Sequence, residues 1–186
     1  MTAAARGVVA LIIGNRRAAE YFDLGPRGLA GSFIAFLAVA GIQAVMPMLL
    51  GATGPDASVF RSIATVAILF ALQVGFSAIV LRQLKRLDGF VPYLVADNWA
   101  TFFVTIGSTL LLMVGLGGEV AIIFIGILVI VIEINIARLI VTLSPLQIAM
   151  FLIAQLVGVS IGLLLIGVIF PMTPAELETL GVSIQP

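Results

Sequence analysis

The sequence contains no histidine and no cysteine. These absences exclude metal sites built on imidazole or thiolate, thiol nucleophiles, disulfides and histidine general bases. A nucleophile elbow, a phosphate-binding loop and a metal triad are also missing, so we expect no catalytic activity and no cofactor. Charged residues make up only 10% of the chain, and nine basic residues balance nine acidic ones. That balance provides no basic field to attract nucleic acid.

Most of the remaining residues are apolar. They make up 62% of the 186 residues, and the mean hydropathy is +1.28. A soluble domain is about 45–50% apolar, and one small globule cannot hide the excess. The sequence therefore predicts a multi-pass membrane protein with a single membrane domain over residues 1–186.

Charged residues and one Ser-Pro pair divide the chain into pieces that match the thickness of a bilayer. Crossing a hydrocarbon core of about 30 Å takes about 20 apolar helical residues. We predict five transmembrane helices, at about 28–50, 62–81, 92–114, 120–142 and 146–170. Helices satisfy their own backbone groups in lipid, and the strand alternation of a barrel is absent. Short connectors such as Gly115–Glu119 make neighbouring helices antiparallel, and the expected fold is an all-α bundle.

The basic residues indicate the orientation. With five spans, eight of the nine fall on one side of the membrane, and only Arg61 falls on the other. Cationic loops stay in the cytoplasm, so we expect a cytoplasmic amino terminus and a short external tail at 171–186. Short loops without glycosylation sequons fit a bacterial inner membrane.

The segment before the first span is predicted to be a short helix on the cytoplasmic interface, over residues 3–22. Cleavage as a signal peptide is the less favoured alternative, because Asn15-Arg16-Arg17 follows the apolar stretch in place of a cleavage site. Its amphipathic pattern is poor, since Val9 and Arg16 fall on nearly the same face. Docking of this helix under the bundle is the other alternative.

Several polar residues interrupt the last three spans at one depth. An ionisable group at the centre of a span costs at least about 2.5 kcal/mol, so it usually faces the bundle interior and has a partner. We expect one polar cluster that opens toward the cytoplasm, with Arg138 bridging Asp97 or Glu133. The cluster comprises Asp97, Asn98, Glu133, Asn135, Arg138, Gln147 and Gln155. Three roles remain open for this cluster: structural hydrogen bonding, a ligand or proton pathway, and a contact with a partner.

Other polar and aromatic residues have simpler expected roles. Gln43 and Gln73 suit hydrogen bonds between helices. Tyr93 and Trp99 suit anchors at the membrane interface. The basic residues Arg82, Lys85 and Arg86 share one helical face and either bind anionic lipid headgroups or act only as a topogenic signal.

Small residues recur every four positions in two spans, which allows another helix to approach closely. One set lies in the fifth span and the other in the second. The sets are Ala154, Gly158 and Gly162, and Ala67, Ala71 and Gly75. Either face can pack within the bundle or mediate self-association.

Two patches resemble the YIP family of five-helix membrane proteins, which has bacterial members. Asp23-Leu24-Gly25-Pro26, before the first span, is similar to the family's Asp-Leu-x-Gly-Pro patch but is one residue shorter. Gly89-Phe90-Val91-Pro92, leading into the third span, is similar to a Gly-Tyr…Pro patch, with Phe in place of Tyr. The resemblance implies a scaffold or organiser. Eukaryotic relatives look like trafficking factors that bind small GTPases.

Two functions follow from these features. A non-catalytic scaffold, assembly factor or subunit of a membrane complex would act through lateral helix contacts with a membrane-protein partner or a second copy, because the loops are small. The alternative is a small-solute, ion or proton transporter that works as a homo-oligomer through the polar cluster. The sequence shows neither an inverted repeat nor a broken helix, which are the features that would support a transporter.

Overall fold

The structure is a computed structural model that describes residues 1–49 and 58–171, and these ranges contain helices and no strand. In chain order the elements are α1 (Thr2–Ile12), η1 (Ala18–Tyr21), α2 (Pro26–Leu49), α3 (Val59–Gln83), η3 (Leu87–Gly89), α4 (Phe90–Met113), α5 (Glu119–Asn135), the π-helical turn η4 (Ile136–Ile140) and α6 (Pro145–Ile169). The connector around residues 50–57 and the predicted tail beyond residue 171 lie outside the described residues.

The five predicted spans are confirmed as five long apolar helices. Their membrane-spanning stretches are Pro26–Met46, Val59–Gln83, Leu87–Met113, Glu119–Ile140 and Pro145–Ile169. The third begins before the expected residue 92. Pro92 is the third residue of α4, where a backbone N–H has no partner in the helix, so proline is tolerated there. The chain is therefore an all-α, multi-pass helix bundle.

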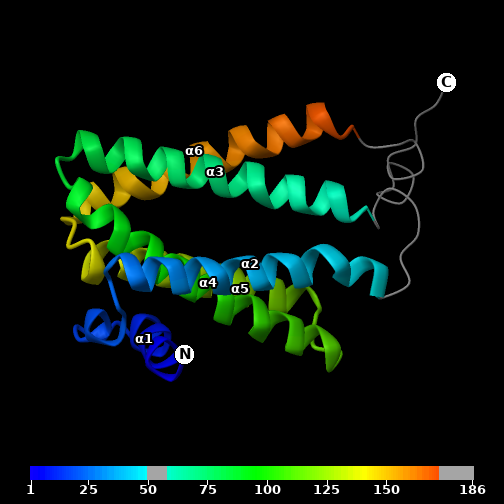
Figure 1. The fold of residues 1–186 in the computed structure, drawn as a ribbon, viewed down its shortest axis with the longest axis horizontal. Coiled ribbons are helices and arrows are strands. Elements are labelled where there is room, and N and C mark those ends of the chain that lie inside the picture. The colour runs from blue at the N-terminus through cyan, green and yellow to red at the C-terminus, as the bar shows by residue number, and fades with distance from the viewer. Residues whose placement is uncertain (50–57, 172–186) are drawn as a thin grey trace.

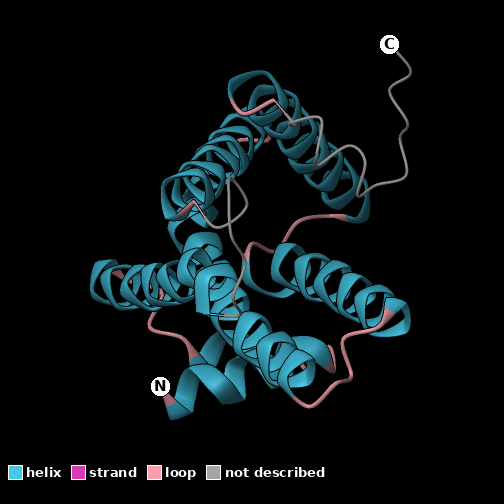
Figure 2. Ribbon diagram, turned by 90° about the vertical axis from the view of Figure 1, so that its right-hand side faces the viewer, coloured by secondary structure: helices cyan, strands magenta, loops and turns pink. Residues whose placement is uncertain are grey.

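The long helices form two groups, which Figures 1 and 2 show from two sides. Helices α3 and α6 pack along each other as one pair, while α2 packs on α4, and α5 lies beside α4. The groups meet at the end of the bundle where α3 ends and α4 and α6 begin, at the left of Figure 1. Much of the buried core lies at this end, including Tyr93, Val95, Ile136, Ala137 and Phe151.

This end of the bundle also collects the cationic segments. The start of α2, the end of α3 and η4 all lie there, and they carry Arg27, Arg82 and Arg138 (Figure 1). Arg61 lies in the first turn of α3, at the opposite end. The structure thus separates these basic residues along the bundle axis, and the side of the membrane that each end faces stays a prediction.

Helix α1 docks under the bundle, which was the alternative to an interfacial helix. It lies across the long helices (Figures 1 and 2) and packs against α4 and α5, while η1, which follows it, contacts η4. Leu11 is completely buried, and its carbonyl oxygen accepts a 2.8 Å hydrogen bond from the Asn135 side-chain amide. The ring of Phe22 lies over Gly7, where a β-carbon would be 2.5 Å from it.

The Asp23–Pro26 patch forms a tight turn into α2. The Asp23 carboxylate accepts a hydrogen bond from the Gly25 backbone N–H at 3.1 Å, and Pro26 is the first residue of the helix. The turn folds back so closely that a β-carbon on Gly28 would lie 1.6 Å from the Asp23 carbonyl oxygen. Glycine at this position is therefore a steric requirement of the turn.

We expect Gly28→Ala to destabilise the protein by about 1–3 kcal/mol, because the turn must move to admit the methyl group. Gly31→Ala, one turn further along α2, is the matched control, since a β-carbon there meets nothing within 4 Å. Thermal unfolding in mild detergent measures the difference. Equal unfolding midpoints for the two variants would contradict the tight turn.

Candidate functional site

Tyr93 is the centre of a polar network that joins four helices. Its side chain is completely buried near the start of α4. The hydroxyl oxygen accepts hydrogen bonds from the Gln155 amide of α6 at 2.7 Å and from the Gln73 amide of α3 at 3.3 Å. The Tyr93 ring meets Phe151 edge to face, with ring centroids 5.1 Å apart. The α3–α6 pair is thereby attached to α4.

The Gln155 amide has more acceptors than it can serve. Besides Tyr93, its nitrogen lies 3.4 Å from a carboxylate oxygen of Glu133 and 3.4 Å from the Ser77 hydroxyl oxygen. An amide nitrogen carries two hydrogens, so three acceptors compete for them. A change in the charge of Glu133 therefore changes which contacts Gln155 makes.

Asp97 of α4, which is buried, and Glu133 of α5, which is half-buried, form a carboxyl pair. The two side chains lie close enough to interact, and two carboxyls can share a hydrogen bond only when one of them carries a proton, because a carboxylate can only accept. Both carboxyls line a cavity of about 180 Å³ between α4 and α5, together with Thr101 and Thr105. Within the described residues, no cationic side chain forms an ion pair with either carboxyl.

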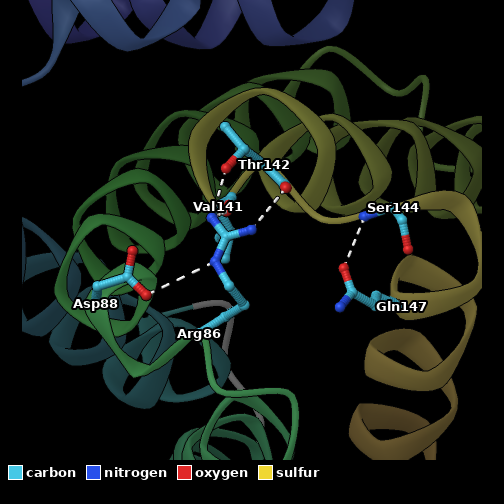
Figure 3. A network of polar contacts seen from close by, with 6 residues as sticks. All are labelled: Arg86, Asp88, Val141, Thr142, Ser144 and Gln147. Atoms are coloured by element: carbon cyan, nitrogen blue, oxygen red, sulfur yellow. Dashed lines mark hydrogen bonds and ion pairs between the residues drawn. The ribbon is translucent and has the colours of Figure 1, made fainter.

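The structure brings together three of the seven residues that were expected to form one cluster: Asp97, Glu133 and Gln155. Three others each make a separate contact. Asn98 donates to the Ser32 hydroxyl of α2 at 3.2 Å, and Asn135 holds α1. Gln147 accepts from the Ser144 backbone N–H at 2.9 Å and caps α6 (Figure 3).

Arg138 does not bridge the carboxyl pair, contrary to the expectation from sequence. It lies in the π-helical turn η4 with its side chain exposed, and it forms no ion pair within the described ranges. A long cationic side chain near the end of a span extends toward the interface, because burying its charge is costly.

The expectation of an interfacial anchor is wrong for Tyr93, which is buried at the centre of the network. A signal was present in the spacing. Tyr93 and Asp97 are four residues apart on α4, and Gln73 and Ser77 are four apart on α3, so each pair shares one helical face. Trp99 is partly buried and stacks on Phe103, with ring centroids 6.0 Å apart.

The predicted headgroup residues divide into two kinds. Arg86 turns inward and clasps the end of η4, as Figure 3 shows. It donates to the carbonyl oxygen of Thr142 at 2.9 Å, to the Thr142 hydroxyl and to the Val141 carbonyl. An ion pair with Asp88 at 3.7 Å steadies it. Arg82 and Lys85 are exposed, and only these two remain placed to meet lipid.

The two stripes of small residues differ in their surroundings. On α6, Gly158 and Gly162 are buried against α3: a β-carbon on Gly158 would lie 3.0 Å from Phe76, and one on Gly162 would lie 2.8 Å from Leu69. Ala154, in the same stripe, is partly buried. On α3, Ala67 and Ala71 are exposed, and a β-carbon on Gly75 meets nothing within 4 Å. The α6 stripe thus packs inside the bundle, and the α3 stripe faces outward.

No protein-family model, curated protein or solved structure matches the chain.

We expect Tyr93→Phe to destabilise the protein by about 1 kcal/mol, because the amides of Gln73 and Gln155 lose their shared acceptor. Tyr21→Phe is the matched control, since Tyr21 is partly exposed and lies outside the network. Thermal unfolding in detergent measures both variants. A Tyr93→Phe protein as stable as the control would show that the hydroxyl contributes nothing.

Proposed function

We propose that this chain is a membrane transporter for an ion or small solute, in which the Asp97–Glu133 pair takes up and releases a proton. The observation that carries this proposal is the carboxyl pair at the edge of a cavity, within two membrane-spanning helices. Ionisable residues inside spans are costly to keep, and they commonly mark proton relays and ion pathways.

Three features support proton exchange at this pair. The two carboxyls contact each other, so one proton between them offsets the repulsion of two charges. The cavity beside them is bordered by the threonines Thr101 and Thr105, whose hydroxyls can donate and accept hydrogen bonds. Gln155 of α6 contacts Glu133, so it connects the two carboxyls to the helices α3 and α6. Release of the proton can therefore affect the packing of α6.

Proton flux into vesicles tests the proposal. Purified protein is reconstituted into phosphatidylethanolamine–phosphatidylglycerol vesicles that contain a pH-sensitive dye, and a potassium gradient with valinomycin sets the potential. We expect Asp97→Asn and Glu133→Gln to lower the proton flux at least about tenfold, because an amide cannot take up the proton. Glu119→Gln, an exposed carboxyl on the same helix as Glu133, is expected to keep the wild-type flux.

Assembly of each variant is checked by size-exclusion chromatography, which separates loss of flux from loss of fold. Infrared spectra add a second readout, since a protonated carboxyl in the wild type has a band that Glu133→Gln or Asp97→Asn removes. Wild-type flux no greater than that of empty vesicles would contradict the transporter.

A non-catalytic scaffold or complex subunit is the second candidate, and the outward-facing stripe of α3 favours it. Ala67, Ala71 and Gly75 leave space for a helix of another protein to approach. The resemblance to YIP-family proteins points in the same direction and stays a prediction. Substitutions at Gly158 and Gly162 are not a test of contacts with other proteins, because these glycines pack α6 against α3 inside the bundle.

Native mass spectrometry of gently extracted protein tests this second candidate. A scaffold predicts a stoichiometric membrane partner or a second copy, which Ala71→Leu releases by blocking the α3 stripe. Ala38→Leu, an exposed alanine of α2, is the matched control and should keep the partner. A monomer without any protein partner would contradict the scaffold.

A further inference from the structure

Two adjoining cavities lie between α2 and α3, toward the end of the bundle opposite the polar network. One, of about 290 Å³, is bordered by Arg61, Ser62, Thr65 and Gln43. The other, of about 320 Å³, is lined by apolar side chains that include Phe36, Ala40, Gly41, Ala67 and Phe70. Val66 borders both cavities, so a polar and an apolar cavity adjoin along the surface between α2 and α3. We call the two together the α2–α3 groove, the polar cavity its mouth and the apolar cavity its interior.

The lining of the α2–α3 groove changes from polar to apolar in the direction in which a membrane leaflet does, from its headgroups to its hydrocarbon chains. Arg61 lies in the first turn of α3, at the end of a spanning helix. Phe70 lies nine residues further along, which is about 14 Å deeper at the rise of an α-helix. At that depth Phe36 and Phe70 stack with ring centroids 4.4 Å apart. The groove therefore passes from headgroup level into the hydrocarbon region.

The polar mouth suits a phosphate group. The Arg61 guanidinium has five N–H donors, so it can bind phosphate oxygens in addition to a contact within the protein. The hydroxyls of Ser62 and Thr65 border the same cavity and supply further donors. Among the basic residues of the described helices, Arg61 is the one at this end of the bundle.

The apolar interior suits a hydrocarbon chain. Gly41 and Ala67 are small and exposed, and a β-carbon on Gly41 meets nothing within 4 Å. Phe33 stacks on Phe36 with ring centroids 6.2 Å apart and lies tilted against Phe70 at 5.9 Å, which extends the aromatic wall. Small residues facing an aromatic wall leave room for a chain to lie along the helices.

We propose that the α2–α3 groove binds one anionic phospholipid, with its phosphate at Arg61 and an acyl chain along Gly41 and Ala67 toward Phe70. This site is independent of the carboxyl pair and of the proposed transport, because it lies between α2 and α3, whereas the carboxyl pair lies between α4 and α5. An amphiphile matches both halves of the groove, whereas an apolar solute or a free anion matches only one half.

Lipid binding to delipidated protein tests the proposal. Protein in detergent micelles is titrated with phosphatidylglycerol or phosphatidylcholine of equal chain length, and native mass spectrometry counts the bound lipids. We expect one lipid site with about fivefold preference for phosphatidylglycerol, which Arg61→Gln abolishes. Arg27→Gln removes an exposed cation at the start of α2, at the other end of the bundle, and should leave the preference unchanged.

Blocking the interior tests the acyl chain separately. Gly41→Leu should weaken binding of both lipids at least about tenfold, because its side chain occupies several methylene positions of the groove. Gly31→Leu is the matched control on α2, since its environment is equally open and it does not line the groove. Unchanged thermal unfolding midpoints confirm that both variants fold.

Four results would overturn the proposal. They are equal binding of the two lipids by the wild type, equal effects of Gly41→Leu and Gly31→Leu, displacement of phosphatidylglycerol by millimolar inorganic phosphate, and a dimer that Gly41→Leu dissociates. The third would assign the polar mouth to a free anion, and the fourth would assign the groove to a second copy of the chain.

Discussion

The hydroxyl of Tyr93 is the point on which the arrangement of the two helix groups depends. Both of its donors, Gln73 and Gln155, belong to the α3–α6 pair, while Tyr93 belongs to α4. In a membrane, apolar helix surfaces have little preference for one another over lipid, because lipid tails are as apolar as leucine. A buried amide in the same surroundings costs several kcal/mol without an acceptor. Hydrogen bonds therefore determine which face of the pair meets α4.

Two further contacts strengthen the same end of the bundle. Arg86, after α3, clasps Val141 and Thr142 at the end of η4, and Asn135 holds α1 through Leu11. A tight fit accompanies the clasp, since a β-carbon on Gly89 would lie 2.5 Å from Val141. The bundle is thus joined through specific polar contacts at the end where α1, η3 and η4 gather, and the α2–α3 groove lies toward the other end.

Sequence reasoning predicted the spans and the depth of the site but not the rotation of each helix. Depth follows from counting residues, so Asp97, Glu133 and Gln155 were correctly expected to lie at one level. Rotation changes by 100° with each residue. Asn98 therefore points away from Asp97 toward α2, and Asn135, two residues after Glu133, lies nearly opposite it and meets α1. Periodicity within one helix cannot identify which neighbour each face meets.

The charge on the Asp97–Glu133 pair and the packing of the α3–α6 pair are linked through one amide group. Gln155 divides two hydrogens among Tyr93, Glu133 and Ser77. An ionised Glu133 is the strongest acceptor of the three, because hydrogen bonds to a charged group are about twice as strong as neutral ones. In the proposed proton exchange, an ionised Glu133 would compete with Tyr93 for the hydrogens of Gln155, while the bond from Gln73 to Tyr93 has no such competitor among the described residues. Because Gln73 and Gln155 lie on different helices, the charge of the pair bears directly on the contact between α6 and α4 and not on the contact between α3 and α4.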